Sequence, residues 1–134
     1  MRRYYSVAPR KFKDANGVEY VKFYANSVSA GNYSSEDMAN DISEATSLSK
    51  ADSVGALRAF SEILETRLIM GYNVKFDRIG TFSLSAISEA CNTEKECKPN
   101  KVKFGKITFK ADNKLRKKMV DVKFYRINAK GKLK

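Results

Sequence analysis

Residues 34–71, SSEDMANDISEATSLSKADSVGALRAFSEILETRLIMG, decide the fold because they predict two helices in close succession. Each helix begins with a serine followed three residues later by an acid, Ser34 by Asp37 and Ser49 by Asp52. In such a capping box the hydroxyl accepts a hydrogen bond from an unpaired first-turn N–H, and the acid complements the positive helix start. Two capping boxes one short helix apart predict a helix–turn–helix.

The second of these helices is predicted to be long and strongly apolar. From Lys50 to Met70 it would span about 31 Å at 1.5 Å per residue, and Gly71 suits the left-handed position that ends many helices. Its apolar side chains recur at steps of one, three and four residues: Val54, Leu57, Phe60, Ile63, Leu64 and Leu68. One small neighbouring helix could not cover this stripe. We therefore expect a homodimer with Phe60, Leu64 and Leu68 in its core, and packing within one chain is the alternative.

The net charge of +11 is concentrated near the C-terminus. Residues 1–97 carry 12 Lys and Arg against 13 Asp and Glu, whereas residues 98–134 carry 14 against 2. Residues 33–71 are net acidic, with 3 basic side chains against 7 acidic ones. Charge segregated in this way favours a polyanionic partner, with nucleic acid ahead of an anionic membrane face. A soluble basic surface with a lysine-rich tail is the alternative.

Composition predicts one domain, residues 1–134, and excludes several classes of protein. No apolar run approaches the 18 or so residues of a membrane-spanning helix, and no apolar signal-peptide core follows the charged start. We therefore expect a cytoplasmic protein, in the nucleoid if bacterial, with no membrane contact. The chain has no His, and helix capping explains its paired acids, so we expect no catalytic residues, metal, cofactor or small-molecule substrate.

The chain has two cysteines, Cys91 and Cys97. Two thiols and no His cannot complete a four-ligand zinc site within one chain. A reversible disulfide and a metal shared between subunits remain open. Two reduced thiols in a mobile loop are the favoured interpretation for a cytosolic protein.

Strands are predicted at both ends of the chain. Asn16-Gly17 predicts a hairpin turn between strands at 3–8 and 18–25. Pro9 is expected to end or bend the first of these strands. A last strand is predicted at 120–127. It should share one small sheet with the hairpin, because neither has enough apolar surface to be stable alone.

A strand pair with a polar excursion is predicted after the long helix. Residues 73–76 and 81–87 are predicted strands, and residues 88–100 form an exposed excursion before a strand at 102–109. Gly105 is predicted to mark a bulge or bend. It separates Val102 and Phe104, expected to face one way, from Ile107 and Phe109, expected to face the other. Asp112 is predicted to cap a short basic helix over 113–120.

This order of elements resembles the HU and integration-host-factor family of bacterial DNA-bending proteins. Three motifs carry the resemblance: Leu48-Ser49-Lys50-Ala51-Asp52, Ile79-Gly80-Thr81-Phe82 and Phe109-Lys110-Ala111-Asp112-Asn113-Lys114-Leu115. They are similar to the family's second-helix start, its Gly-x-Phe strand turn and the entry to its last helix. The match covers about residues 33–120, and both ends resemble longer HU-like variants with extra terminal strands.

The resemblance implies an α+β fold, an HU-like intertwined dimer with a helical body, a β-saddle with arms and a short C-terminal helix. Residues 33–120 would form this core, with the arm at about 86–103. Residues 1–32 would be an N-terminal strand extension, and residues 121–134 a C-terminal strand and basic tail. The arms would embrace the DNA minor groove. The acidic helices would then face away from DNA.

The predicted phosphate contacts are six basic residues: Lys103, Lys106, Lys110, Lys114, Arg116 and Lys117. The first three alternate along a strand, although a bend at Gly105 could redirect Lys106. The others crowd a helix start, where backbone N–H groups also favour anions. A solvated lysine face is the alternative for the set. Arg78 replaces a family glycine and is expected to have a structural or surface role.

The sequence therefore favours two functions. The first is largely sequence-neutral DNA binding by a nucleoid-associated homodimer, held by contacts of Lys and Arg with phosphates. The second is a dimeric protein-interaction or scaffold domain that keeps the HU-like body without DNA bending. The predicted arm tip motivates this second function, because it holds Glu89, Glu94 and Glu96 where the family has a DNA-wedging Arg-Asn-Pro motif. The added strands, whose edges could pair with a partner, motivate it too.

Overall fold

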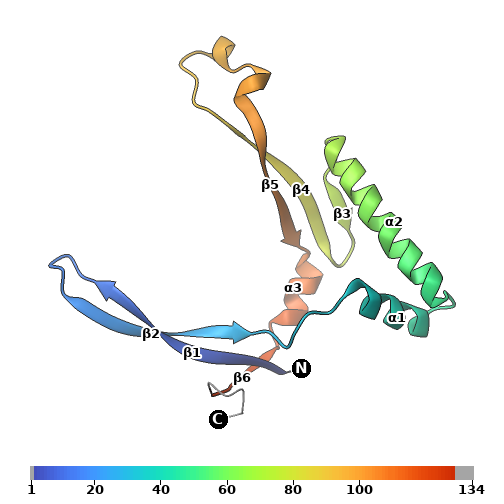
Figure 1. The fold of residues 1–134 in the computed structure, drawn as a ribbon, viewed down its shortest axis with the longest axis horizontal. Coiled ribbons are helices and arrows are strands. Elements are labelled where there is room, and N and C mark those ends of the chain that lie inside the picture. Colours follow the sequence, from blue (N-terminus) through green and yellow to red (C-terminus); the bar gives the residue numbers. More distant parts are fainter. Residues whose placement is uncertain (1, 129–134) are drawn as a thin grey trace. The chain divides into compact units, whose positions relative to one another are not determined.

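The computed structural model describes residues 2–128, and the chain in it divides into two compact units (Figure 1). Among the described residues, the terminal unit combines residues 2–33 with residues 119–128, and the body unit is formed by residues 34–118. The basic tail expected at the C-terminus lies outside the described residues from residue 129 onward. The fold is of the mixed α+β class, with three α-helices and two three-stranded sheets in the described part of the chain.

The body unit begins with α1 (Ser35–Ala45) and α2 (Lys50–Ile69), as the capping residues predict. At α1 both halves of the capping box form. Asp37 N donates to Ser34 Oγ over 3.1 Å, and Asp37 Oδ2 accepts from Ser34 N over 2.9 Å. At α2 the hydroxyl half forms, with Asp52 N donating to Ser49 Oγ over 3.0 Å. These three hydrogen bonds fix where the two helices start.

The α1 capping box makes a prediction about pH. Hydrogen bonds from Ser34 hold the pKa of Asp37 below its usual 3.8, and the charge of Lys50 acts in the same direction. A carboxyl with a depressed folded-state pKa stabilises the fold fully above its unfolded-state value and loses that contribution as pH falls through the folded value. NMR titration should therefore give Asp37 a midpoint below 3.8. The Asp37→Asn variant should lose less stability than the parent when acidified below 3.8, and an equal loss would contradict this.

The end of α2 has the geometry that Gly71 predicts. Gly71 has φ 92°, and its N–H donates to Leu68 O over 3.1 Å. Tyr72 N donates to Arg67 O over 3.0 Å. These two bonds form a Schellman motif, which needs a residue in the left-handed region where glycine is favoured. The chain therefore leaves α2 sharply and returns along it as a strand.

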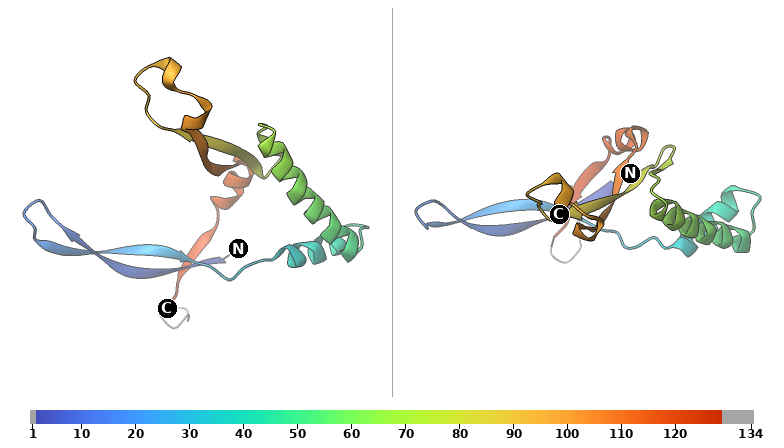
Figure 2. Two further views of the ribbon diagram at one scale, coloured as in Figure 1. Left: turned by 45° about the horizontal axis from the view of Figure 1, so that its top comes forward. Right: turned by 90° about the horizontal axis from the view of Figure 1, so that it is seen from above.

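The body sheet has the strand order β3-β4-β5 and is antiparallel throughout (Figure 2). Its strands are β3 (Val74–Phe76), β4 (Gly80–Ser88) and β5 (Val102–Ala111). Two short 3₁₀ helices, Glu94–Glu96 and Pro99–Lys101, lie in the excursion between β4 and β5, and α3 (Asn113–Met119) follows β5. Gly80 allows the close strand contact at the β3–β4 turn. A Cβ there would collide with the carbonyl oxygen of Lys110 and the ring of Phe109.

The bulge predicted at Gly105 forms, but the expected division of side chains around it was wrong. Ser85 pairs with Lys106 and Ala86 pairs with Phe104, so Gly105 is the extra residue on β5. A bulge changes the alternation of side chains by one step. The apolar residues before and after it therefore share one face: Val102, Phe104, Ile107 and Phe109 lie opposite Ser88, Ala86, Leu84 and Phe82. Gly105 redirects the strand so that a single apolar face continues through it.

This apolar face packs against α2 through a row of rings. The Phe60 ring of α2 lies 4.6 Å from that of Phe76, between centroids. Phe82 lies 6.3 Å from Phe76 and 4.9 Å from Phe109. Even so, the described residues of a single chain bury few side chains, the apolar ones being Ala39 and Leu68. The core of the body unit is therefore thin for a folded domain.

The terminal sheet has the strand order β2-β1-β6, as the pairing of the two chain ends predicts. Its strands are β1 (Arg2–Lys13), β2 (Glu19–Val28) and β6 (Lys123–Arg126). β1 is antiparallel to β2 and parallel to β6. The hairpin turn is held by Asp14, whose Oδ1 accepts from Asn16 N over 2.8 Å and from Val18 N over 2.9 Å.

Pro9 does not end β1, so this part of the expectation that it would end or bend the strand was wrong. β1 continues to Lys13, and Pro9 pairs with Phe23. Counting outward from the Asp14 N to Val18 O hydrogen bond of 3.0 Å, this pair falls at a non-hydrogen-bonded position. Since β6 reaches only as far as Tyr5, no strand in the described chain would need the missing N–H of Pro9. The hairpin is therefore long and continuous.

Candidate nucleic-acid interface

The body sheet carries a row of lysines on the face opposite its apolar one. Residues paired across an antiparallel sheet point to the same side, so the register defines this face directly. Its members, named here the lysine face, are Lys75, Thr81, Ser83, Ser85, Ile87, Lys103, Lys106, Thr108 and Lys110. All four lysines are exposed. The predicted contacts Lys103, Lys106 and Lys110 are thus brought together, and the Gly105 bulge keeps Lys106 with the other two.

Hydroxyl groups fill the spaces between the lysines. Ser83 Oγ and Thr108 Oγ1 lie 3.3 Å apart, and Lys106 N donates to Ser85 Oγ over 3.1 Å. The lysine face contains no Asp or Glu. With strands about 4.8 Å apart and about 3.3 Å per residue, its lysines span roughly 20 Å by 10 Å. A duplex carries one charge per about 1.7 Å of its axis, so a patch of this length can meet several phosphates.

Lys75 belongs to this face and was missed by the sequence analysis. It pairs with Thr81, which pairs with Lys110 on its other side, so Lys75 and Lys110 flank one position of β4. The sequence did indicate that Lys75 faces away from the apolar side, since it alternates with Val74 and Phe76 in a short strand. Its assignment needed the cross-strand register, because a three-residue strand has no pattern of its own long enough to fix a face.

A second group of cations lines a hollow of about 350 Å³ beside α3. Its walls are formed by Arg78, Lys114, Leu115, Lys117 and Lys118. Lys114, Lys117 and Lys118 follow the three- and four-residue spacing of one helix side. The predicted contact Arg116 is exposed and does not line the hollow. The structure therefore gathers Lys114 and Lys117 with two cations that were not predicted, and leaves Arg116 apart.

The start of α3 differs from the expected anion site. Asp112 caps the helix, as predicted, with Lys114 N donating to Asp112 Oδ2 over 2.9 Å. This carboxylate occupies the position that a phosphate would need at the helix start. The attraction of the hollow for anions therefore comes from its side-chain charges.

Arg78 connects the turn before β4 with this basic hollow. It has φ 68°, a left-handed conformation that costs a non-glycine residue roughly 1–2 kcal/mol. Its side chain lines the hollow, which the expected structural or surface role did not include. Strained residues held in this way cluster at functional sites.

Arg78 allows a test in which stability and binding move in opposite directions. The Arg78→Gly variant should melt at a higher temperature, because it relieves the backbone, yet bind duplex DNA more weakly, because the hollow loses one cation. Calorimetry and fluorescence anisotropy with a short duplex would measure the two effects. The Arg116→Ala variant removes a cation outside the hollow and serves as the control. Equal losses of affinity in both variants would contradict a special role for the hollow.

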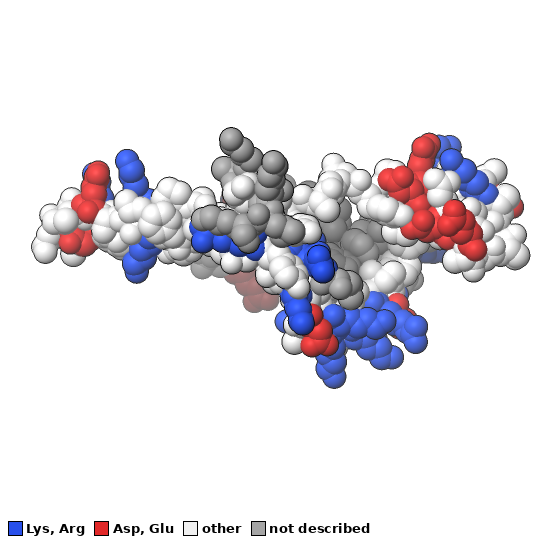
Figure 3. All heavy atoms as spheres, turned by 90° about the horizontal axis from the view of Figure 1, so that it is seen from below, with Lys and Arg blue, Asp and Glu red and all other residues white. Residues whose placement is uncertain are grey.

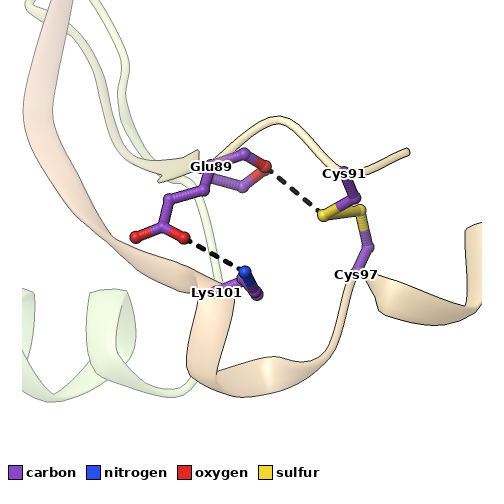
Figure 4. Close-up of a disulfide and its surroundings, with 5 residues drawn as sticks. Glu89, Cys91, Cys97 and Lys101 are labelled. Carbon is purple, nitrogen blue, oxygen red and sulfur yellow. Dashed lines mark hydrogen bonds and ion pairs between the residues drawn. A yellow bond between two sulfur atoms is a disulfide. The ribbon is translucent and has the colours of Figure 1, made fainter. Parts of the chain in front are cut away.

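The arm tip is closed by a disulfide between Cys91 and Cys97 (Figure 4), so the expectation of two reduced thiols was wrong for this structure. Their Cα atoms lie 5.7 Å apart, within the usual range for such a bond. At the base of the tip, Lys101 Nζ lies 3.3 Å from Glu89 Oε2, and Glu89 N donates to Lys101 O over 3.3 Å. Pro99 begins the 3₁₀ helix that leads directly into β5. The tip is therefore a small closed loop that carries acids.

Reduction of the disulfide is expected to loosen the arm tip without unfolding the body. Closing a loop of this size contributes about 2 kcal/mol in the chain-entropy model, or roughly thirty-fold in a local opening equilibrium. Limited trypsin cleavage after Lys95 should therefore speed up on adding dithiothreitol, while the melting temperature changes little. The Cys91→Ser variant should be cleaved at the fast rate with or without reductant. Equal rates for oxidised and reduced protein would contradict this.

The two signs of charge gather on different parts of the body unit. Figure 3 shows red side chains concentrated at the right of the view, over α1 and α2, and a blue cluster at the lower centre over α3. The helical pair carries Glu36 and Asp37 in the first turn of α1 and Asp52 in that of α2. α1 has four acids and no base, so it would repel a phosphate backbone, whereas α2 has three side chains of each sign. A polyanion would therefore approach the lysine face or α3 and avoid α1.

The three dimer-core candidates differ in their exposure within one chain. Leu68 is buried, Leu64 is half-buried, and Phe60 keeps 39% of its surface exposed. A shallow apolar groove of about 280 Å³ lies between α2 and the sheet. It is lined by Ser61, Leu64, Glu65, Leu68, Ile69, Phe82, Leu84 and Ile107. One chain alone leaves this groove open to water.

Residues 2–128 contain no cluster of three or more His, Cys, Asp or Glu that could hold a metal ion. Within the same residues, no helix is both long and apolar enough to cross a membrane. The candidate site is defined by the cations of the lysine face and of the basic hollow.

The chain resembles known proteins in family and in fold. The family model HU-HIG, described as an HU domain fused to wHTH, Ig, or glycine-rich motif, matches residues 1–126. No curated protein matches the chain. A crystal structure of a protein from Bacteroides vulgatus ATCC 8482, provisionally described as a bacterial DNA binding protein, aligns with a TM-score of 0.65 at 7% identity. The alignment covers 94% of this chain and 48% of that one, so the chain spans about half the length of its structural neighbour.

Proposed function

Because the chain belongs to the HU-HIG family of HU domains fused to other motifs, we propose that it binds duplex DNA as an architectural, largely sequence-neutral homodimer. Family membership also favours a binding protein over an enzyme. The DNA would be held by contacts of Lys and Arg with phosphates, from the side of the minor groove. The proposed location is the bacterial nucleoid, in the cytoplasm.

The observation that carries this proposal is the lysine face. Lys75, Lys103, Lys106 and Lys110 lie on one side of one sheet, with hydroxyls and no carboxylate among them. Lysine is a flexible point charge that attracts phosphate without reading bases. Hydroxyls and lysines provide few fixed bidentate contacts to base edges. This chemistry favours affinity for the backbone over preference for sequence.

The second part of the proposal, the homodimer, rests on the thin core of a single chain. Leu84 and Ile107 remain exposed at the apolar groove, and Phe60 of α2 is exposed as well. A chain that buries so little apolar surface gains too little free energy to offset the conformational entropy lost on folding. A second copy that covers α2 and the groove would supply the missing burial. It would also double the number of lysines offered to one duplex.

A salt titration tests the proposal. Six to eight phosphate contacts per dimer give a slope of about −5 to −7 for log K against log salt, at about −0.9 per contact. We expect a slope in this range for unrelated 20-base-pair duplexes, with affinities within a few-fold of one another. A slope near zero, or strong dependence on sequence, would overturn the proposal.

A slope near zero would favour a dimeric protein-interaction or scaffold domain, the second candidate function. The specific observation behind it is the outer edge of β2, which has no partner strand among the described residues. An open strand edge can pair with an extended segment of another protein. The acids Glu94 and Glu96 at the arm tip would also weaken contact with DNA there.

A further inference from the structure

The terminal sheet has one face that combines aromatic rings with cations. The register of its three strands places the even-numbered residues of β1 and β2 on one side together with Lys123 and Tyr125 of β6. This side, named here the ring face, is formed by Arg2, Tyr4, Ser6, Ala8, Arg10, Phe12, Tyr20, Lys22, Tyr24, Asn26, Val28, Lys123 and Tyr125. Five of these residues are aromatic and four are cationic. Neither DNA binding by the lysine face nor dimerisation uses them.

The charge of the ring face has one sign. It has no Asp or Glu, whereas the opposite face of the same sheet carries Glu19 beside Lys13. The opposite face also carries the cations Arg3, Lys11 and Arg126 among apolar residues that include Val7, Val21, Phe23 and Phe124, so its distinguishing charge is the carboxylate of Glu19. A surface with four cations and no carboxylate favours a polyanion over a neutral or basic partner.

The rings and cations of the ring face are in direct contact. The Arg10 guanidinium lies 4.8 Å from the centroid of the Tyr24 ring, and Lys22 Nζ lies 5.7 Å from that of Tyr20. Phe12 stacks on Tyr20 at 5.5 Å with an interplanar angle of 20°. The rings stay accessible, since Tyr20 and Tyr24 keep 41% and 38% of their surfaces exposed. The cation–π pairs hold the rings in place before a ligand binds. Little side-chain entropy is therefore lost on binding.

We propose that the ring face binds single-stranded nucleic acid, with bases stacked on the rings and phosphates held by Arg2, Arg10, Lys22 and Lys123. Base–aromatic stacking beside a positively charged track is the general chemistry of single-strand binding. The bases of a duplex already stack on one another and are not offered to the rings. The lysine face contains no aromatic residue, so it suits duplex phosphates. The two faces therefore select different forms of nucleic acid.

The first test uses the full chain and compares a 20-nucleotide oligo-dT with an abasic 20-mer of the same charge. Stacking is worth about 5- to 150-fold in affinity per base, so oligo-dT should bind at least ten-fold more tightly. Binding should also quench tyrosine emission, which is observable because the chain has seven Tyr and no Trp. Equal affinities for the two oligomers would overturn the proposal. Comparison of oligo-dT with oligo-U tells whether DNA or RNA is preferred.

The second test places the binding on the ring face. The Tyr24→Leu variant should bind oligo-dT about ten-fold more weakly, and the Tyr20→Leu variant should do the same. The matched control is Phe23→Leu, which changes the neighbouring residue on the opposite face, where Phe23 is 70% exposed. Its affinity should stay within two-fold of the parent. Equal losses in Tyr24→Leu and Phe23→Leu would overturn the proposal.

Two further variants separate binding at the ring face from a loss of folding and from binding at the lysine face. If Tyr24→Leu melts early, the double variant Arg10→Gln, Lys22→Gln should still flatten the salt slope for oligo-dT by about 1.4 units per ring face in a fully folded protein, at about 0.7 per contact with a single strand. The Lys103→Ala, Lys110→Ala variant should lose duplex affinity and keep oligo-dT affinity.

Two outcomes would assign the ring face to another ligand. If poly-glutamate competes with labelled oligo-dT as strongly as unlabelled oligo-dT does, the ligand is an acidic protein segment instead. A change in sedimentation of Tyr24→Leu alone would assign it to a second copy of the chain.

Discussion

Replacing Lys103 and Lys110 with alanine is expected to flatten the salt slope of duplex binding by about 3 to 4 units. Two substitutions in each copy of a homodimer remove four charges, and each phosphate contact contributes about 0.9. Both lysines lie on the lysine face, opposite Ile87 and Thr81 of β4. At low salt the affinity should fall by orders of magnitude. Because the lost contacts are with phosphates, the loss should be similar for every duplex sequence.

The control for this experiment removes the same number of charges from the acidic side of the body. Lys50 begins α2 and Arg58 lies further along it, and neither belongs to the lysine face or the basic hollow. The Lys50→Ala, Arg58→Ala variant should keep its slope within about one unit of the parent. An unchanged slope in the Lys103→Ala, Lys110→Ala variant would place the duplex elsewhere on the chain.

Introducing a charge at Phe60 is expected to unfold the chain and not to release a soluble monomer. The Phe60 ring packs 4.6 Å from Phe76 and has its outer side open in one chain. In the proposed dimer that side is covered, so the carboxylate of Phe60→Glu would be buried without a partner. Such a charge costs several kcal/mol, against a total stability of about 5–15 kcal/mol. Circular dichroism and sedimentation should show loss of structure, with aggregation at micromolar concentration.

Leu64→Glu should behave like Phe60→Glu, because Leu64 lines the apolar groove that the second copy would cover. Ala51→Glu is the matched control. It introduces the same acid on the same helix, but at an exposed position in the first turn, where the helix dipole favours negative charge. A Phe60→Glu protein that stays folded and sediments as a monomer would sink the dimer proposal.

Features that depend on neighbouring residues in the chain could be predicted from the sequence. The caps Ser34, Ser49 and Asp112 and the C-terminal Gly71 lie where their chemistry predicts, since each acts through backbone groups within a few residues. The bulge at Gly105 was also predicted, because two apolar residues on each side of it are out of phase. Local rules of this kind need no knowledge of the partner strand.

Features that depend on distant residues could not be predicted in this way. Whether Pro9 interrupts β1 depends on which strand lies on its other side, and β6 stops short of it. The place of Lys75 on the lysine face depends on its pairing with Thr81. The role of Arg78 depends on α3, which comes more than thirty residues later. In each case the missing information is a contact across the sheet or between turn and helix.

The single extra residue at Gly105 determines which side of the sheet each residue in the outer half of the arm takes. Beyond it, Ala86 pairs with Phe104 and Ile87 with Lys103. If Gly105 paired with Ala86 in a regular ladder, Phe104 would lie opposite Ile87 and Lys103 opposite Ser88, and the two would exchange sides, because side chains alternate with a period of two. Deleting Gly105 would remove the bulge and leave both residues on their present sides. The bulge therefore keeps the odd residue of β5 out of the ladder, so that the charged side of the arm continues through it.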